Sequence, residues 1–144
     1  MKKRITLIIG ILIILILGVF LVGNYLIESV GGFTTSERTI TKNLNEKEEL
    51  IKITIDENAE FPHSMDLKMK GEINGTGIIQ YGWSDSSFYH TDTITDKFLL
   101  DKNGGDWYND SVFIKYTPLT ATDGQLKIDC SIYSSKKKNN VLQQ

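Results

Sequence analysis

The chain has 144 residues, of which 40% are hydrophobic and 24% charged, and its formal net charge at pH 7 is −2. This length allows one domain of ordinary size. Three of the 16 basic residues lie at positions 2–4 and three at 136–138, so the rest of the chain has ten basic and 18 acidic residues, a net charge of −8. Binding to a nucleic-acid backbone depends on clustered Lys and Arg, so this acidic composition argues against a nucleic acid as partner.

An uncharged apolar run extends from Ile5 to Ile27. As a helix it would be about 35 Å long, enough to cross a hydrocarbon core of about 30 Å. Basic residues fill positions 2–4, and the next basic residue is Arg38. The positive-inside rule therefore predicts that residues 1–4 are a cytoplasmic flank, that residues 5–27 are a transmembrane anchor, and that the rest of the chain is extracytoplasmic. The lipid bilayer is the first expected partner.

A cleaved signal peptide is the alternative to this anchor, because Ser29, Val30 and Gly31 form a small-x-small cleavage site. The apolar region of a signal peptide has only about 7–15 residues, however, and the run here is much longer. We therefore favour an uncleaved single-pass anchor. The short basic start and the Ile-rich run are typical of a bacterial inner or plasma membrane protein.

The chain after the anchor divides into three parts by composition. Residues 28–49 are polar, with one pair of glycines near their start, which predicts a stalk; a short helix near 45–49 or a first strand around 37–42 are options within it. Residues 50–134 show short segments of alternating polarity and predict a β domain. Residues 135–144 have no core-forming pattern and predict a disordered tail.

Alternating apolar residues predict the strands of this domain. The inward-facing sets are Ile51, Ile53, Ile55; Met65, Leu67, Met69, Ile73; Ile94, Phe98, Leu100; Val112, Ile114, Tyr116; and Leu126, Ile128, Cys130, Ile132. Asn74-Gly75 separates two alternating runs, and this dipeptide predicts a type I′ turn that joins the flanking strands in a hairpin. About six to eight short strands without an intervening helix predict an all-β fold, an antiparallel β-sandwich or a small open barrel.

The segment 99–110, "LLDKNGGDWYND", gathers several side-chain oxygens around two glycines. Its spacing does not fit an EF-hand loop, because Asp106 stands where the sharp turn needs Gly and Val112 where the bidentate Glu belongs. A weaker calcium site with Asp101, Asp106 and Asp110 is the remaining metal hypothesis. We favour a glycine-enabled turn between two strands instead, and we expect no cofactor.

Aromatic residues form the most interesting set of candidate ligand-binding side chains. Trp107 and Tyr108 lie in the predicted turn, where exposure is common, and Trp83 lies in a second aromatic cluster. Exposed rings flanked by Asp and Asn suit stacking on sugars. The competing interpretation places Trp83 in the core, on the same strand face as Ile79 and Tyr81.

Catalytic patterns are weak throughout the chain. His90 and Asp92 share one face of a predicted strand, but no third partner is identifiable and no Gly-x-Ser-x-Gly elbow occurs. The single cysteine, Cys130, excludes an intrachain disulfide and is expected to be a small buried hydrophobe. We therefore expect a non-catalytic binding or assembly module of the cell envelope, whose partner is an unknown envelope protein or glycan. The alternatives are a carbohydrate-binding domain and a small envelope hydrolase that uses His90 with Asp92.

Overall fold

A computed structural model describes residues 10, 12–23 and 32–137 of the chain. Residue 10 and residues 12–23 are helical, and residues 33–137 form a separate compact unit. Among the described residues, no helix combines the length and the apolar character needed to cross a membrane. The predicted anchor, residues 5–27, lies partly outside the described residues, as do the predicted cytoplasmic flank 1–4 and most of the predicted tail.

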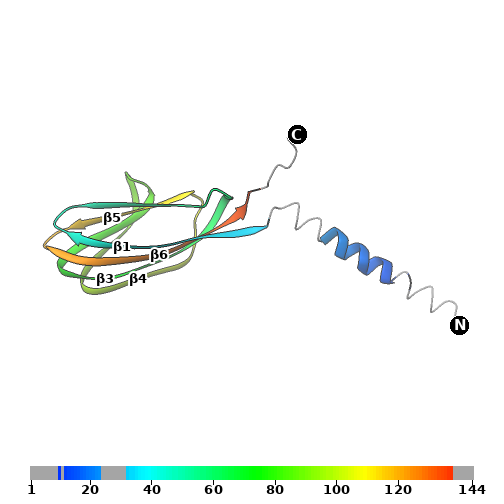
Figure 1. Ribbon diagram of the computed structural model, residues 1–144, viewed down its shortest axis with the longest axis horizontal. Coiled ribbons are helices and arrows are strands. Elements are labelled where there is room, and N and C mark those ends of the chain that lie inside the picture. Colours follow the sequence, from blue (N-terminus) through cyan, green and yellow to red (C-terminus); the bar gives the residue numbers. More distant parts are fainter. Residues whose placement is uncertain (1–9, 11, 24–31, 138–144) are drawn as a thin grey trace. The chain divides into compact units, whose positions relative to one another are not determined.

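Six antiparallel strands make up the compact unit (Figure 1). They are β1 (Phe33–Asn45), β2 (Glu49–Thr54), β3 (Ala59–Ser84), β4 (Ser87–Asp106), β5 (Ser111–Pro118) and β6 (Asp123–Lys136). They form one sheet in the order β1-β6-β3-β5-β2, and β4 pairs with the other side of β3. The sheet curls into an open half-barrel. The predicted all-β antiparallel class is therefore confirmed, and the arrangement fits a β-sandwich or a small barrel.

The sheet folds over because β3 changes partner half-way along its length. Up to Ile73, β3 pairs with β6, and from Gly77 onward it pairs with β5. On its other edge β3 pairs with β4 on both sides of this point. The sheet therefore has two layers. The β6 layer contains β1, β6, residues 59–73 of β3 and residues 97–106 of β4. The β5 layer contains β2, β5, residues 76–84 of β3 and residues 87–95 of β4.

The bend between the layers is built from backbone conformation rather than from a loop. Gly75 on β3 has φ of 114° and Asp96 on β4 has φ of 47°, so both strands turn through positive φ at the same level. The segment that joins β5 to β6 packs here, where the N–H groups of residues 119, 120 and 121 all donate to the Thr76 carbonyl oxygen. These hydrogen bonds hold the bend.

The hairpin predicted at Asn74-Gly75 is wrong. Both residues lie inside β3, and the strands on either side of them do not pair with each other. The turn that reverses the chain lies instead at residues 85–86, between Ser84 and Ser87. Gly75 does have positive φ, but it bends one long strand instead of closing a hairpin, because the segment that joins β5 to β6 supports the bend.

The sheet also begins earlier than the sequence suggested. β1 covers Phe33–Asn45, within the region that we expected to be a stalk, and pairs with β6 along its whole length. It includes the strand considered around 37–42. Its alternation is weak because only Ser36 and Leu44 are buried. β6 likewise continues to Lys136, into the predicted tail.

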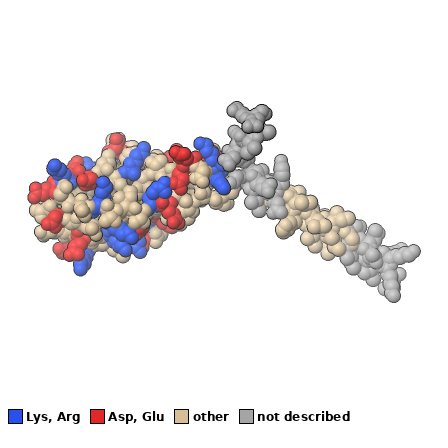
Figure 2. Space-filling model, in the orientation of Figure 1, with Lys and Arg blue, Asp and Glu red and all other residues tan. Residues whose placement is uncertain are grey.

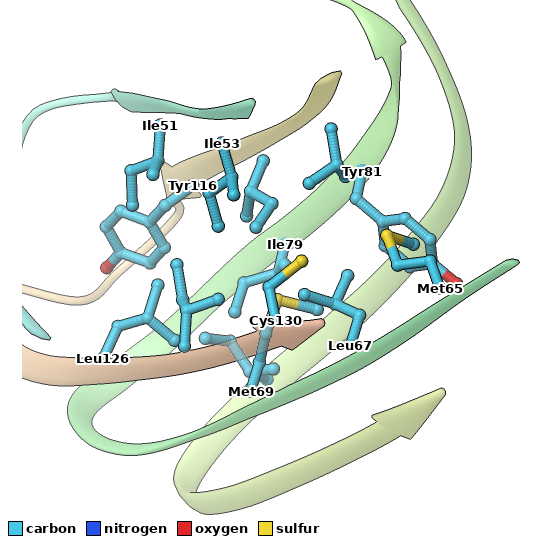
Figure 3. Close-up of a cluster of buried hydrophobic side chains, with 14 of the residues drawn as sticks. Ile51, Ile53, Met65, Leu67, Met69, Ile79, Tyr81, Tyr116, Leu126 and Cys130 are labelled. Atoms are coloured by element: carbon cyan, nitrogen blue, oxygen red, sulfur yellow. The ribbon is translucent and has the colours of Figure 1, made fainter. Parts of the chain in front are cut away.

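The core lies between the two layers (Figure 3). Ile51, Ile53 and Tyr116 point from the β5 layer toward Leu126 and Cys130 of the β6 layer. The alternation predicted for β2, β5 and β6 is confirmed, because each of these strands buries one face. Cys130 is buried as predicted, and burial, together with the nearby Asp66 carboxylate, raises the pKa of its thiol to about 12.

Candidate ligand cleft

A cleft of about 390 Å³ opens beside β4, the strand that has only β3 as a neighbour. Its lining comes from both layers: Met65, Tyr81, Tyr89, His90, Asp101, Lys102, Asn103, Gly105, Asp106 and Trp107. The two halves of β4 approach each other here, since Lys102 Nζ of the β6 layer lies 3.7 Å from Asp92 Oδ2 of the β5 layer. The fold of the sheet thus turns two separate parts of one strand into opposite walls.

Aromatic rings form the wall on the β5 layer. Tyr81 and His90 are paired across β3 and β4, and their rings stack with centroids 4.5 Å apart and an interplanar angle of 14°. The Tyr89 ring contacts this stack through His90. It also lies next to the rings of Trp83 and Trp107, with centroid distances of 5.1 Å and 6.1 Å. Tyr89 therefore links the exposed Trp83 to the interior of the cleft.

Tyr81 is the buried member of this wall and keeps its proton over a wide pH range. Desolvation raises the pKa of its hydroxyl to about 12, and the nearby Tyr89 and Asp92 act in the same direction. Burial also raises the pKa of Tyr89, although hydrogen bonding with Trp83 opposes this shift. At neutral pH both phenols are neutral hydrogen-bond donors and acceptors.

The opposite wall is a bulge in β4. Between the pairs Leu67–Lys102 and Met65–Gly105 the register shifts, and Gly104 takes φ of 69°. The Gly104 N–H donates to Asp66 Oδ1 at 2.6 Å, and the hydroxyl of Tyr133 donates to Asp66 Oδ2 at 2.8 Å. This second bond raises the pKa of Tyr133. One carboxylate therefore supports the bulge from the neighbouring strand.

The turn predicted across segment 99–110 is therefore placed incorrectly. β4 continues to Asp106, and only residues 107–110 form the connection to β5. The sequence predicts a special backbone conformation for the glycines of this segment, and Gly104 does have positive φ. This conformation forms a bulge within β4 rather than a turn, because Gly105 and Asp106 continue to pair with Met65 and Ser64 of β3.

The three aromatic residues predicted to bind a ligand have different environments. Trp107 is only 2% exposed, so the prediction that it faces solvent is wrong. Its main-chain N–H donates to the His63 carbonyl oxygen, whereas its indole N–H is buried without a hydrogen-bond partner. Tyr108 is 72% exposed, and Trp83 is 54% exposed although its strand face suggested the core. Only Trp107 lines the cleft, and Trp83 reaches its rim through Tyr89.

The candidate metal ligands do not converge. Asp101 lies 3.7 Å from Lys68 Nζ, Asp106 pairs with Ser64 at the end of β4, and the Asp110 carbonyl oxygen accepts a hydrogen bond from Ile55. Within residues 10, 12–23 and 32–137, no group of three His, Cys, Asp or Glu residues could hold a metal ion.

His90 and Asp92 also have separate partners. The His90 ring stacks on Tyr81, whereas Asp92 forms its ion pair with Lys102. The arrangement offers flat rings and hydrogen-bonding groups, which is suited to holding a ligand. Sequence reasoning missed Tyr81, Tyr89, Lys102 and Asn103 as members of one site. The only local signal was the density of aromatic residues between 81 and 90.

No family model matches the chain, and no curated protein matches it by sequence. Solved structures resemble it distantly. A structure described as PirA has a TM-score of 0.47 and 9% identity, and the match covers 62% of this chain and 90% of PirA. A structure from Bacillus endospore appendages, described as a family of disulfide-linked pili, has a TM-score of 0.45 and 8% identity, with 73% of this chain and 89% of that chain covered. Dimeric latent PorU from Porphyromonas gingivalis has a TM-score of 0.47 and 6% identity, and the match covers 70% of this chain but 13% of PorU. Similarities at this level carry no argument about function.

Proposed function

We propose that the chain is a single-pass membrane protein that displays its β domain outside the cytoplasm as a non-catalytic binding module of the cell envelope. The uncharged run 5–27 behind the basic positions 2–4 supports the anchor and its orientation. Residues 12–22 are helical, and apart from Gly18 all of their side chains are apolar and exposed. Such side chains favour a lipid environment.

The binding role rests on one observation, the stacked Tyr81–His90 pair on one wall of a cleft whose other wall carries polar side chains. Neutral phenols and the carboxylate and amide groups of Asp106 and Asn103 line the same space. Mostly apolar clefts with a few convergent polar groups are typical of ligand sites. His90 and Asp92 have separate partners, so we do not propose the hydrolase alternative.

A carbohydrate is the second, more specific candidate for the ligand. Tyr89 and Trp83 present partly exposed rings at the rim. The Asn103 amide can donate hydrogen bonds to sugar hydroxyl groups and accept them, and the Asp106 carboxylate can accept them. The ion pairs of Lys102 with Asp92 and of Lys68 with Asp101 compensate part of the local charge. This lining favours a neutral sugar ring over a strongly anionic polymer.

The orientation can be tested with introduced cysteines, because the native Cys130 is buried and does not react. We expect Ser86→Cys, in the exposed turn at residues 85–86, to react with a membrane-impermeant maleimide in intact cells. Lys3→Cys is the matched control and should react only after permeabilisation. Labelling of Ser86→Cys only in broken cells would contradict an extracytoplasmic domain.

The cleft can be tested by titrating the full chain in detergent with neutral oligosaccharides of glucose and of N-acetylglucosamine, using intrinsic Trp fluorescence. We expect a saturable change with at least one of them, its loss in Tyr89→Ala, and its retention in Tyr108→Ala, since Tyr108 does not line the cleft. Unchanged emission together with no retention on immobilised polysaccharide would exclude the carbohydrate candidate. Loss of binding in Tyr108→Ala alone would place the site on the 107–110 connection instead.

A further inference from the structure

The exposed aromatic side chains of the β domain all lie at one end of it. Within residues 32–137 these side chains are Phe33, Phe61, Trp83, Tyr89 and Tyr108, whereas the other large exposed hydrophobic residues are the leucines at 50, 99 and 119. Phe33 begins β1 and pairs with Ser135 near the end of β6. Its ring meets that of His63 edge-on, with centroids 5.8 Å apart. The domain therefore begins and ends where its exposed rings gather.

Backbone contacts bring the remaining rings to the same end. The main-chain N–H of Trp107, which precedes Tyr108, donates to the His63 carbonyl oxygen. The Asn109 side chain lies 3.4 Å from the Trp83 carbonyl oxygen, and Lys137 N–H donates to the Asn58 carbonyl oxygen. We call this surface, formed by Phe33, Phe61, Trp83, Tyr89 and Tyr108, the aromatic end.

Phe61 is the most unusual member of the aromatic end. It has φ of 50° at a break in the β3–β6 register, and its side chain is 74% exposed. A bulky residue at positive φ is strained relative to an ordinary conformation. The ring faces outward and does not belong to the buried core, so core packing does not explain this conformation. Outliers of this kind point to a role for the exposed side chain.

The length of chain before Phe33 limits what the aromatic end can meet. Only residues 28–32 separate it from Ile27, the last residue of the apolar run. Five extended residues span at most about 18 Å. If the run is a membrane anchor, as proposed above, this short linker holds Phe33, and with it the aromatic end, close to the bilayer surface.

We propose that the aromatic end contacts the headgroup region of the bilayer that holds the anchor. Trp and Tyr concentrate at this interface, because their rings are apolar and their N–H or O–H groups remain hydrated. The inference rests on the proposed anchor and adds a second contact that orients the domain against the membrane.

Charge at this end does not favour anionic lipids. Lys136 and Lys137 are basic, but Asp56, Glu57 and Glu60 are acidic and lie in the adjoining segments. Figure 2 shows Lys or Arg and Asp or Glu interspersed over the visible face of the domain. The partner is therefore the phospholipid interface itself, and aromatic side chains rather than net charge make the contact.

The test uses the full chain reconstituted in phosphatidylcholine vesicles that contain a brominated phosphatidylcholine, which quenches nearby Trp. In a Trp83→Phe background, Phe61→Trp places a probe at the aromatic end. Leu119→Trp is the matched control, because Leu119 is exposed and its N–H bonds to Thr76 at the bend of the sheet, away from the chain's entry. Trp107 is buried, present in both variants, and reports folding.

We expect Phe61→Trp to lose clearly more emission than Leu119→Trp, with the same loss when part of the lipid is replaced by phosphatidylglycerol. Equal quenching at both sites would overturn the contact, and quenching only with phosphatidylglycerol would overturn the aromatic basis for it. Flotation of the vesicles after carbonate extraction separates the two proposals. A chain that floats but shows equal quenching keeps its anchor, whereas a chain that does not float loses both.

Discussion

Replacement of Gly75 by Ala should strongly destabilise the β domain. At φ of 114°, an L side chain is strained, which costs about 1–3 kcal/mol. A Cβ at this position would also lie 2.7 Å from the Thr120 carbonyl oxygen and 2.9 Å from Ala121 Cα, and both are backbone atoms. The 119–122 segment must therefore move, which weakens its hydrogen bonds to Thr76, each worth about 0.5–1.5 kcal/mol. The expected loss is about 3–5 kcal/mol in the free energy of unfolding.

Gly104→Ala is the matched control for this prediction. Gly104 also has positive φ, 69°, but a Cβ there would meet no atom within 4 Å. Only the conformational cost remains, about 1–2 kcal/mol. Urea unfolding of the chain in detergent, followed by the emission of buried Trp107, gives both values from shifts of the midpoint. Equal losses in the two variants would refute the idea that the bend depends on the close approach at Gly75.

Three further predictions follow from buried or hydrogen-bonded groups. The Cys130 thiol, with its pKa raised to about 12 by burial, should resist a disulfide reagent at neutral pH until denaturant is added; rapid reaction of the native chain would contradict its burial. Asp66→Ala removes the acceptor of two hydrogen bonds and should cost about 1–3 kcal/mol, whereas Asp66→Asn should cost less, and both should lower the pKa of Tyr133, measured by tyrosinate absorption. Burial raises the pKa of Tyr81 from the ordinary tyrosine value of 10.0 to about 12. As pH rises between these values, the unfolded chain loses this proton and the folded chain keeps it, so the free energy of unfolding should fall in this range. An identical alkaline decline in Tyr81→Phe would show that Tyr81 does not cause it.

The sequence predicted best the strands that bury one face. In β2, β5 and β6, apolar and polar residues alternate because the core lies on one side and solvent on the other. β1 escaped a firm assignment because it lies at the edge and buries only Ser36 and Leu44. Its stability comes from pairing with β6, and pairing between distant segments leaves no periodic pattern in either segment alone.

The sequence predicts positive φ at Gly75 and Gly104, but not whether that conformation forms a hairpin, a bend in a strand or a bulge. Asn74-Gly75 and Asn103-Gly104 were both recognised as places where the backbone turns, and Gly75 and Gly104 have the expected conformation. One bends a continuous strand and the other forms a bulge. The difference is set by neighbouring segments: residues 119–121 donate hydrogen bonds to the Thr76 carbonyl oxygen, and Asp66 accepts one from the Gly104 N–H. A two-residue motif contains no information about such partners.

The candidate site depends even more on distant contacts. Trp107 follows a pair of glycines and an Asp, a context that is common in exposed turns, yet it is buried. β4 continues beside β3 as far as Asp106, and the next residue, Trp107, therefore lies beside Tyr89, with ring centroids 6.1 Å apart. Asp92 and Lys102 meet only because the sheet folds between them. The same bend that creates the core therefore creates the cleft. Gly75→Ala, which displaces the segment that supports the bend, should lower both stability and ligand binding, whereas Tyr89→Ala should weaken binding alone. Measuring both quantities in both variants separates the residues that build the cleft from those that contact its ligand.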